Sequence, residues 1–279
     1  MPNSSLSRIA RDPLAAGFGL VLLLLVAASV VVPLVSPFPY ARQSLEETFH
    51  GPGGQHWLGT DHLGRDLLTR LAYGGRISFL ISGTAVLAHT GIGVLAGLAA
   101  GYFGGRVDGA LMRLTDIVLA FPPLLFVILV TGLLGARIGY IILALSLVGW
   151  AGMARQIRAE ALVLRSRDFV GAARALGATD GRILTRHVLA NVLTLAVVRA
   201  SLDVGPVILS ESTLSFLGIG VQPPTPSWGI MIAEGFAHVR AHPYLTVIPA
   251  ITLTLAILAL TFLGESLADA LDPRRRGAR

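Results

Sequence analysis

The chain has 279 residues, of which 53% are apolar and only 14% are charged, and its mean hydropathy is +0.71. Soluble globular domains carry about 25% charged residues, so this composition excludes an ordinary soluble enzyme. All 22 basic residues are arginine, and cysteine is absent. The chain therefore lacks a thiolate metal site, a cysteine nucleophile and a Schiff-base lysine, and it has no P-loop lysine with which to hydrolyse ATP itself.

Six apolar blocks are long enough to cross a hydrocarbon layer of about 30 Å as helices. The first follows the basic stretch from Arg8 to Arg11 and is longer than a signal-peptide core of about 7–15 residues, so we expect it to be a retained span. The expected fold is all-α, a polytopic membrane protein with six transmembrane helices at residues 14–35, 77–101, 111–134, 138–154, 188–210 and 245–263.

The distribution of arginine predicts the orientation. Six spans place both termini on one side of the membrane, and a cytoplasmic N-terminus puts 15 arginines inside and six outside, with Arg199 inside a span. Cytoplasmic loops carry an excess of positive charge, so both termini are expected in the cytoplasm. This topology accounts for the pI near 10.6 without nucleic acid as a partner.

Three segments between the predicted spans are long enough to fold. Residues 36–76 and 211–244 lie outside in this topology and are rich in Gly, Pro and aromatic residues, so we expect them to form caps over a pore. Residues 155–187 lie inside and carry seven arginines. Their pattern predicts two short helices joined by a turn, the second capped by Thr179 or Asp180 and continuing into the fifth span.

The first helix of the inner segment has an apolar face. Asp168 is a candidate cap for a helix over residues 169–176, and Gly177 stands where a left-handed residue ends a helix. The positions i, i+3, i+4 and i+7 form one face of small and apolar residues, namely Phe169, Ala172, Ala173 and Leu176. This face predicts docking into a groove of another protein, and the alternative is a connector lying on the bilayer surface. A DNA-reading helix–turn–helix is disfavoured because the adjoining spans keep its second helix out of a groove.

The inner segment resembles the EAA loop of ABC importer permeases. It matches that pattern at Ala172, Ala173, Gly177 and Leu189, whereas Gly171, His187 and Ala190 replace its Glu, Ile and Pro. Other blocks resemble the second permease subunit of the dipeptide, oligopeptide and nickel branch, and the resemblance covers nearly the whole chain. They are His56–Asp66, Gly101–Asp108, Leu214–Gly220, Pro223–Gly229 and Leu271–Pro273.

The resemblance implies one permease subunit with the type I ABC importer fold, in a bacterial or archaeal plasma (inner) membrane. Its implied partners are a homologous second permease, cytoplasmic ATP-binding subunits, an extracytoplasmic substrate-binding protein and the lipid bilayer. It implies no cofactor and no catalytic activity in this chain. ATPase coupling is expected at the inner loop, in particular at Asp168, Phe169, Gly171, Ala172, Ala173, Leu176 and Gly177.

We divide the chain into two parts on this basis. Residues 1–76 contain the N-terminal tail, the first span and an outer loop. Residues 77–279 form a core permease domain with spans two to six, including the coupling loop 155–187 and the outer loop 211–244.

Charged residues mark two further candidate sites. Asp61 and Arg65 stand four residues apart and can pair, and with Asp66 they form either an outer gate or docking surface or a capped helix start that folds the outer loop. Arg199 and Asp203 stand four apart within the fifth span, where an unpaired charge costs at least about 2.5–3.5 kcal/mol. They are either translocation residues or a structural pair.

The cargo is expected to be short peptides. The alternative is nickel or a nickel chelate, but the only suggestive metal pair, His238 and His242, precedes a proline and lacks a completing carboxylate, so we expect no metal site. A secondary transporter would need a midplane relay, for which Arg199 and Asp203 are the only candidates. A membrane enzyme would need a nucleophile, base or metal shell, and the motifs for these are missing.

Overall fold

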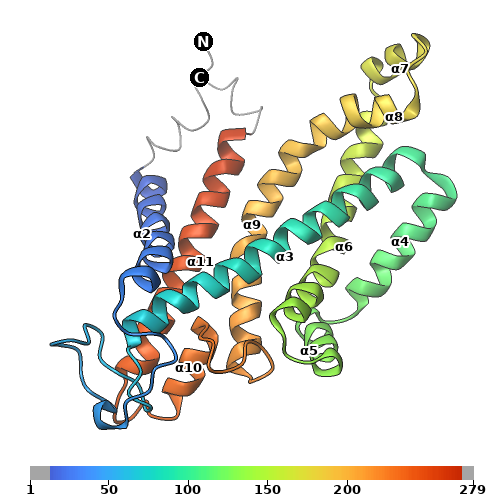
Figure 1. Cartoon of the computed structure of the whole chain (residues 1–279). Helices are drawn as coiled ribbons and strands as arrows, with labels where there is room; N and C mark the ends of the chain where they lie inside the picture. The colour runs from blue at the N-terminus through green and yellow to red at the C-terminus, as the bar shows by residue number, and fades with distance from the viewer. Residues whose placement is uncertain (1–12, 272–279) are drawn as a thin grey trace.

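The computed structural model describes residues 13–271 (Figure 1). Residues 1–12 and 272–279 lie outside the described range, and with them Arg8, Arg11, the four C-terminal arginines and most of the Leu271–Pro273 motif. No β-strand occurs between residues 13 and 271. The helices are α2 (Pro13–Val35), α3 (Leu67–Phe103), α4 (Gly105–Ala120), α5 (Pro123–Leu134), α6 (Ile138–Arg165), α7 (Asp168–Ala175), α8 (Asp180–Ile183), α9 (Leu189–Phe216), α10 (Trp228–Phe236) and α11 (Tyr244–Leu271), with a 3₁₀ turn at Leu45–Glu47 and a π turn at Leu184–Val188.

Five helical stretches are long and apolar enough to cross a membrane. They are Pro13–Val35, Leu67–Phe103, Ile138–Arg165, Asp180–Phe216 and Tyr244–Leu271. The pair α4 and α5 passes the same criterion together, which gives six spans when this bent pair is taken as one. The prediction of an all-helical polytopic membrane protein is confirmed.

The prediction of one continuous helix over residues 111–134 is wrong. α4 ends at Ala120 and α5 begins at Pro123, and the two helices are bent by 89°. Pro122 disfavours the helical conformation at the residue before it, and Phe121 is extended, with φ −89° and ψ 138°. The two successive prolines also lack the N–H groups that would continue the helical ladder. The third membrane segment is therefore a broken span.

Four helices are longer than the predicted spans. α6 continues from residue 154 to Arg165, so the predicted inner segment 155–187 begins with 11 helical residues, and α11 runs over Tyr244–Leu271 instead of residues 245–263. α3 begins at Leu67 rather than at residue 77, because the Asp66 carboxylate accepts a hydrogen bond from the Thr69 backbone N–H at 2.7 Å and caps the helix. α9 continues to Phe216, into the segment predicted as the outer loop 211–244. Polar residues occupy these helix ends, so apolar composition alone does not predict that the helices continue there.

Among the described residues, the most extensive packing between two helices is that of α3 against α6. Gly93, Gly97 and Gly101 of α3 face α6 so closely that a Cβ atom on any of them would lie 2.5–2.7 Å from an α6 atom. Small residues at a spacing of four allow membrane helices to approach in this way. α3 runs obliquely through the bundle from the outer loops at one end to α4 at the other (Figure 1).

The two ends of the molecule contain different elements. The start of α2, the end of α11 and helices α7 and α8 lie toward one end of the molecule, and α10 lies with the segment 36–66 toward the other (Figure 1). This is the arrangement expected when the bent pair counts as one crossing. We call the layer formed by residues 36–66 and 217–243 the outer layer, and residues 166–188 the inner loop.

Candidate functional site

Four charged residues hold the outer layer together. Arg65 Nε donates to Asp61 Oδ2 at 2.6 Å, and Arg65 Nη2 and Arg70 Nη2 donate to the same Glu234 oxygen at 2.9 and 2.7 Å. Arg70 Nε also lies 3.4 Å from Asp61 Oδ2. Arg65 and Arg70 are only 2% and 1% exposed. Two cations and two carboxylates thus compensate one another at a buried position between residues 61–70 and α10.

The predicted pairing of Asp61 with Arg65 is confirmed, but the sequence pattern missed half of this cluster. Glu234 is separated from Arg65 by 169 positions, and no local spacing links the two. Arg70 lies within the first turns of α3 and is one of the six arginines that the predicted topology places outside. Asp61 also accepts the backbone N–H groups of Leu63 and Arg65, at 2.9 and 3.0 Å, so it shapes the turn that precedes the helix.

The outer layer also brings three possible metal-ligating residues together. Donor atoms of Asp61, His62 and Glu234 all lie within 4.8 Å of one another. Both carboxylates already bind Arg65 and Arg70, whose charges repel a divalent cation. Burial lowers the pKa of His62 and so favours the neutral ring, which is the form that ligates metals, but the arginine charges beside both carboxylates oppose a cation there. This set is therefore better suited to ion pairing than to metal binding.

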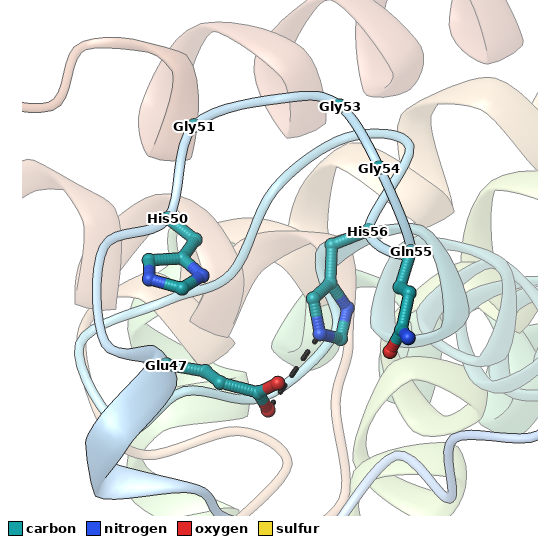
Figure 2. A pocket seen from close by; sticks show the side chains of 7 residues that line it. All are labelled: Glu47, His50, Gly51, Gly53, Gly54, Gln55 and His56. Carbon is teal, nitrogen blue, oxygen red and sulfur yellow. Dashed lines mark ion pairs between the residues drawn. The ribbon is translucent and has the colours of Figure 1, made fainter.

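Asp66 serves the fold of the outer loop. Besides capping α3, its carboxylate accepts a hydrogen bond from His56 Nδ1 at 2.8 Å, and both side chains are buried. The opposite ring nitrogen of His56 points toward Glu47 at 3.7 Å across a surface pocket of about 480 Å³ (Figure 2). The loop through Gly51, Gly53 and Gly54 borders this pocket (Figure 2). The geometry of Asp66 fits the alternative of a capped helix start.

The two histidines that suggested a metal pair face an aromatic ring. The His238 and His242 rings lie 5.0 and 4.2 Å from the Phe49 ring, the second stacked at an interplanar angle of 7°. His238 also stacks on His62, at 5.4 Å. Both histidine rings are thus packed between the two outer segments.

Within the membrane, the predicted pair Arg199–Asp203 is joined by a third residue. Arg199 Nε lies 3.0 Å from Asp203 Oδ1, and His89 Nε2 from α3 lies 3.3 Å from Asp203 Oδ2. His89 is 1% exposed, whereas the Arg199 side chain is 41% exposed on the surface of the chain. Asp203 therefore connects a buried histidine with a surface arginine.

Glu211 is a buried carboxylate that the sequence reading placed in the outer loop. It lies in α9 and is 0% exposed. Its oxygens accept hydrogen bonds from Ser78 and Ser215, both at 2.8 Å, and from Ser212 at 3.3 Å. These bonds tie α9 to α3 near the outer layer. The serines around Glu211 were the available signal, but Ser78 lies 133 positions away.

The inner loop presents apolar side chains to its surroundings. On α7, only Val170 is buried, and it packs with Ile183 and Val188. Phe169 is 42% exposed and Leu176, just after the helix, is 88% exposed. Gly171 and Ala172 are exposed too, whereas Ala173 packs against the apolar core of this chain. The predicted apolar face is therefore divided. Ala173 packs against the chain's own core, whereas Phe169, Ala172 and Leu176 remain exposed.

The turn chemistry of the inner loop is mostly as predicted. Gly177 has φ +79°, the left-handed conformation that glycine adopts without a steric penalty. Thr179 caps α8, which continues through the π turn into α9. The predicted side-chain cap by Asp168 is wrong, because α7 begins at Asp168 itself and Arg167 occupies the cap position without a side-chain bond. Asp168 instead places a negative charge in the first turn, where the helix dipole favours it.

These features define a class of protein. Helices long and apolar enough to cross a membrane, an outer layer whose charges pair within the chain and an inner loop with exposed apolar residues describe a polytopic membrane protein. Residues 93–277 match the family of binding-protein-dependent transport system inner membrane components, and the chain belongs to this family. Members of the family are permeases of ABC importers, so the family implies separate ATPase and substrate-binding partners.

Three relatives are similar over almost the whole chain. The dipeptide transport system permease protein DppC of Bacillus subtilis (strain 168) is 40% identical over 270 residues, which cover 96% of this chain and 84% of the relative. The oligopeptide transport system permease protein OppC of Haemophilus influenzae is 39% identical over 271 residues, 96% of this chain and 87% of the relative. The glutathione transport system permease protein GsiD of Escherichia coli O6:K15:H31 is 38% identical over 271 residues, 97% and 89% respectively.

Proposed function

We propose that this chain is the permease subunit of an ATP-binding-cassette importer that moves short peptides into the cytoplasm. The observation that carries the proposal is similarity at 38–40% identity, over almost the whole chain, to permeases named for dipeptides, oligopeptides and glutathione. The expected partners are a homologous second permease, two cytoplasmic ATP-binding subunits and an extracytoplasmic substrate-binding protein. The absence of lysine from the sequence supports this division of labour, since the P-loop belongs to a partner.

In this proposal the inner loop couples ATP hydrolysis to transport. The exposed residues Phe169, Gly171, Ala172 and Leu176 form the surface that a groove of the ATP-binding subunit covers. Ala173, Gly177 and Asp168 hold that surface in place, through core packing, the left-handed turn and the first helical turn. Closure of the ATP-binding subunits then moves α7 and shifts the spans between inward-facing and outward-facing arrangements.

The outer layer is the proposed docking region for the substrate-binding protein. Asp61, Arg65 and Asp66 are 4%, 2% and 5% exposed, so their part is to shape this region and not to touch the partner. The half-exposed Arg199, held by Asp203, faces the second permease or the path between the two permeases. A cation at this depth requires a partner or water, and the Asp203 carboxylate supplies the partner.

The proposed orientation places α7 and both termini in the cytoplasm. The sequence has no cysteine, so single cysteines report accessibility cleanly. Arg182→Cys on the exposed start of α8 should react only with reagents that enter the cytoplasm, and Gln222→Cys in the outer layer should react with impermeant reagents in intact cells. The reverse pattern at both positions would invert the topology.

Cargo is tested by competition uptake in cells that carry the reassembled importer. Unlabelled dipeptides and short oligopeptides should reduce uptake of a labelled peptide, and nickel salts should not. Replacing both His238 and His242 by Ala should leave peptide uptake measurable. The two rings pack on Phe49, so we expect them to contribute to the packing of the outer layer and not to bind the cargo. Nickel accumulation without peptide uptake would replace the peptide assignment by the nickel alternative.

A further inference from the structure

The last turn of α3 contains a tyrosine that the proposed function does not yet use. Tyr102 is 4% exposed, and its hydroxyl faces the inner loop. The hydroxyl donates to Asp180 Oδ1 at 2.5 Å and accepts from Arg174 Nη2 at 3.3 Å. Arg174 belongs to α7 and Asp180 begins α8. A single phenol oxygen therefore joins α3 to both short helices of the inner loop.

A third bond converges on the same point. Arg165, the last residue of α6, donates from Nη1 to the backbone carbonyl of Tyr102 at 3.0 Å. Gly104 follows α3 in a left-handed conformation with φ +67°, and a Cβ atom there would approach Arg165 Nη1 to 3.0 Å. The end of α3 is thus fixed to α6, α7 and α8 within one stretch, residues 102–104.

α7 has few other links to the rest of the chain. Val170 is its only buried residue, and Ala173 is partly buried beside it. Apolar contacts of this kind are non-directional and tolerate sliding. The Tyr102 hydroxyl instead fixes α7 to α3 through Arg174, and it fixes the start of α8, which follows α7 after a short turn, through Asp180. The hydroxyl is therefore the directional part of the joint between the inner loop and the membrane helices.

α3 is also the element that reaches the outer layer. Its 37 residues correspond to about 55 Å of helix at about 1.5 Å per residue. Near its outer end, Arg70 binds Glu234 of α10, and Asp66 caps its first turn. A shift of α7 that is passed to Tyr102 therefore acts on a helix that runs to the opposite face of the molecule (Figure 1).

We propose that Tyr102 is a positioning residue for coupling, which passes movement of α7 to α3 through its hydroxyl bonds to Asp180 and Arg174. This inference rests on the proposed function of the inner loop as the ATPase docking element. Without the hydroxyl, α7 still presents Phe169 and Leu176, so the ATP-binding subunits still bind and hydrolyse ATP. The movement of α7 is then poorly transmitted, and fewer peptides are transported for each ATP hydrolysed.

The experiment measures peptide uptake and ATP hydrolysis in the same proteoliposomes, with the complete importer reassembled. For Tyr102→Phe, the ratio of peptide transported to ATP hydrolysed should fall about tenfold, the scale set by a hydrogen bond to a charged group. Co-purification of the ATP-binding subunits should not change. Tyr140→Phe is the matched control. Tyr140 lies in the first turn of α6, far along that helix from Arg165, and its hydroxyl makes no hydrogen bond within residues 13–271.

Variants of Asp180 separate coupling from a folding defect. Asp180 is exposed, so Asp180→Ala removes the acceptor at little cost to packing and should lower the ratio as Tyr102→Phe does. Asp180→Asn keeps an acceptor oxygen and should restore most of the ratio. The double variant Tyr102→Phe with Asp180→Ala should be no worse than the worse single variant, since both remove the same bond.

A wild-type ratio in Tyr102→Phe, loss of ATPase co-purification in that variant, or additive effects in the double variant would overturn this inference alone. If the wild-type importer shows no peptide-dependent uptake, the proposed function fails and the inference fails with it. The two failures are thus distinguished by the wild-type measurement.

Discussion

The outer layer and the inner loop treat charged and apolar side chains in opposite ways. Where the outer layer meets the start of α3, Arg65 and Arg70 are buried and are matched by Asp61 and Glu234 of the same chain. In the inner loop, Leu176 is 88% exposed although it is apolar. The charged groups of the outer layer find their partners within the chain, whereas the inner loop leaves an apolar surface exposed, which we propose is covered by the ATP-binding subunit. Damage to the first should therefore appear as lost stability, and damage to the second as lost assembly.

The largest expected effect is on the outer layer. Asp61→Asn keeps an oxygen for the backbone N–H groups of Leu63 and Arg65 but leaves Arg65 and Arg70 with a single carboxylate. Breaking a buried ion pair costs about 3–5 kcal/mol, so the solubilised chain should unfold at a clearly lower temperature. Glu46→Gln, at an exposed position of the same segment, is the control and should unfold like the wild type. Equal unfolding temperatures for Asp61→Asn and wild type would show that the charge cluster does not support the layer.

The pair of Arg199 and Asp203 tests whether charged residues of the membrane-spanning helices also stabilise the fold by pairing within the chain. Asp203→Asn leaves Arg199 without its carboxylate, at a cost of about 2.5–3.5 kcal/mol for a charge at this depth. The double variant Arg199→Gln with Asp203→Asn strands no charge and should recover most of the stability and uptake. Thermal unfolding and peptide uptake are compared for both variants. A double variant at least as impaired as the worse single variant would mean that the two residues act independently along the path.

A smaller effect is expected at the turn that ends α7. Gly177→Val forces a β-branched residue into φ +79°, which costs about 1–2 kcal/mol. The space around Gly177 is open, so the strain acts on the backbone alone. The chain should still insert and unfold near the wild-type temperature, while co-purification of the ATP-binding subunits falls. If the unfolding temperature fell strongly while co-purification stayed intact, the inner loop would support the stability of the chain and not its assembly with the ATP-binding subunits.

Local chemistry explains which features the sequence could predict. The spans follow from apolar composition, the left-handed turn from Gly177, the cap of α8 from Thr179, and the Asp61–Arg65 pair from a spacing of four. The adjacent prolines Pro122 and Pro123 indicate the break in the third span, but the apolar block is long enough for one span and therefore predicted a continuous helix.

Other features depend on contacts between distant segments. Glu234 meets Arg65 across 169 positions, and Tyr102 meets Asp180 across 78. No periodicity reports such pairs. The helical spacing of α7 identified an apolar face but not which part of it the chain would cover itself, and Ala173 lies on the covered side. Tertiary packing decides both questions.

The proposed function requires the exposed surface of the inner loop to dock against the ATP-binding subunit. Because the chain has no native cysteine, Leu176→Cys can carry a photoreactive maleimide as its only label, with Gln222→Cys in the outer layer as the matched control. Illumination of membranes containing the complete importer should join the Leu176→Cys chain covalently to the ATP-binding subunit and should give no such product with Gln222→Cys. An assembled importer that yields no cross-link from Leu176→Cys would contradict the claim.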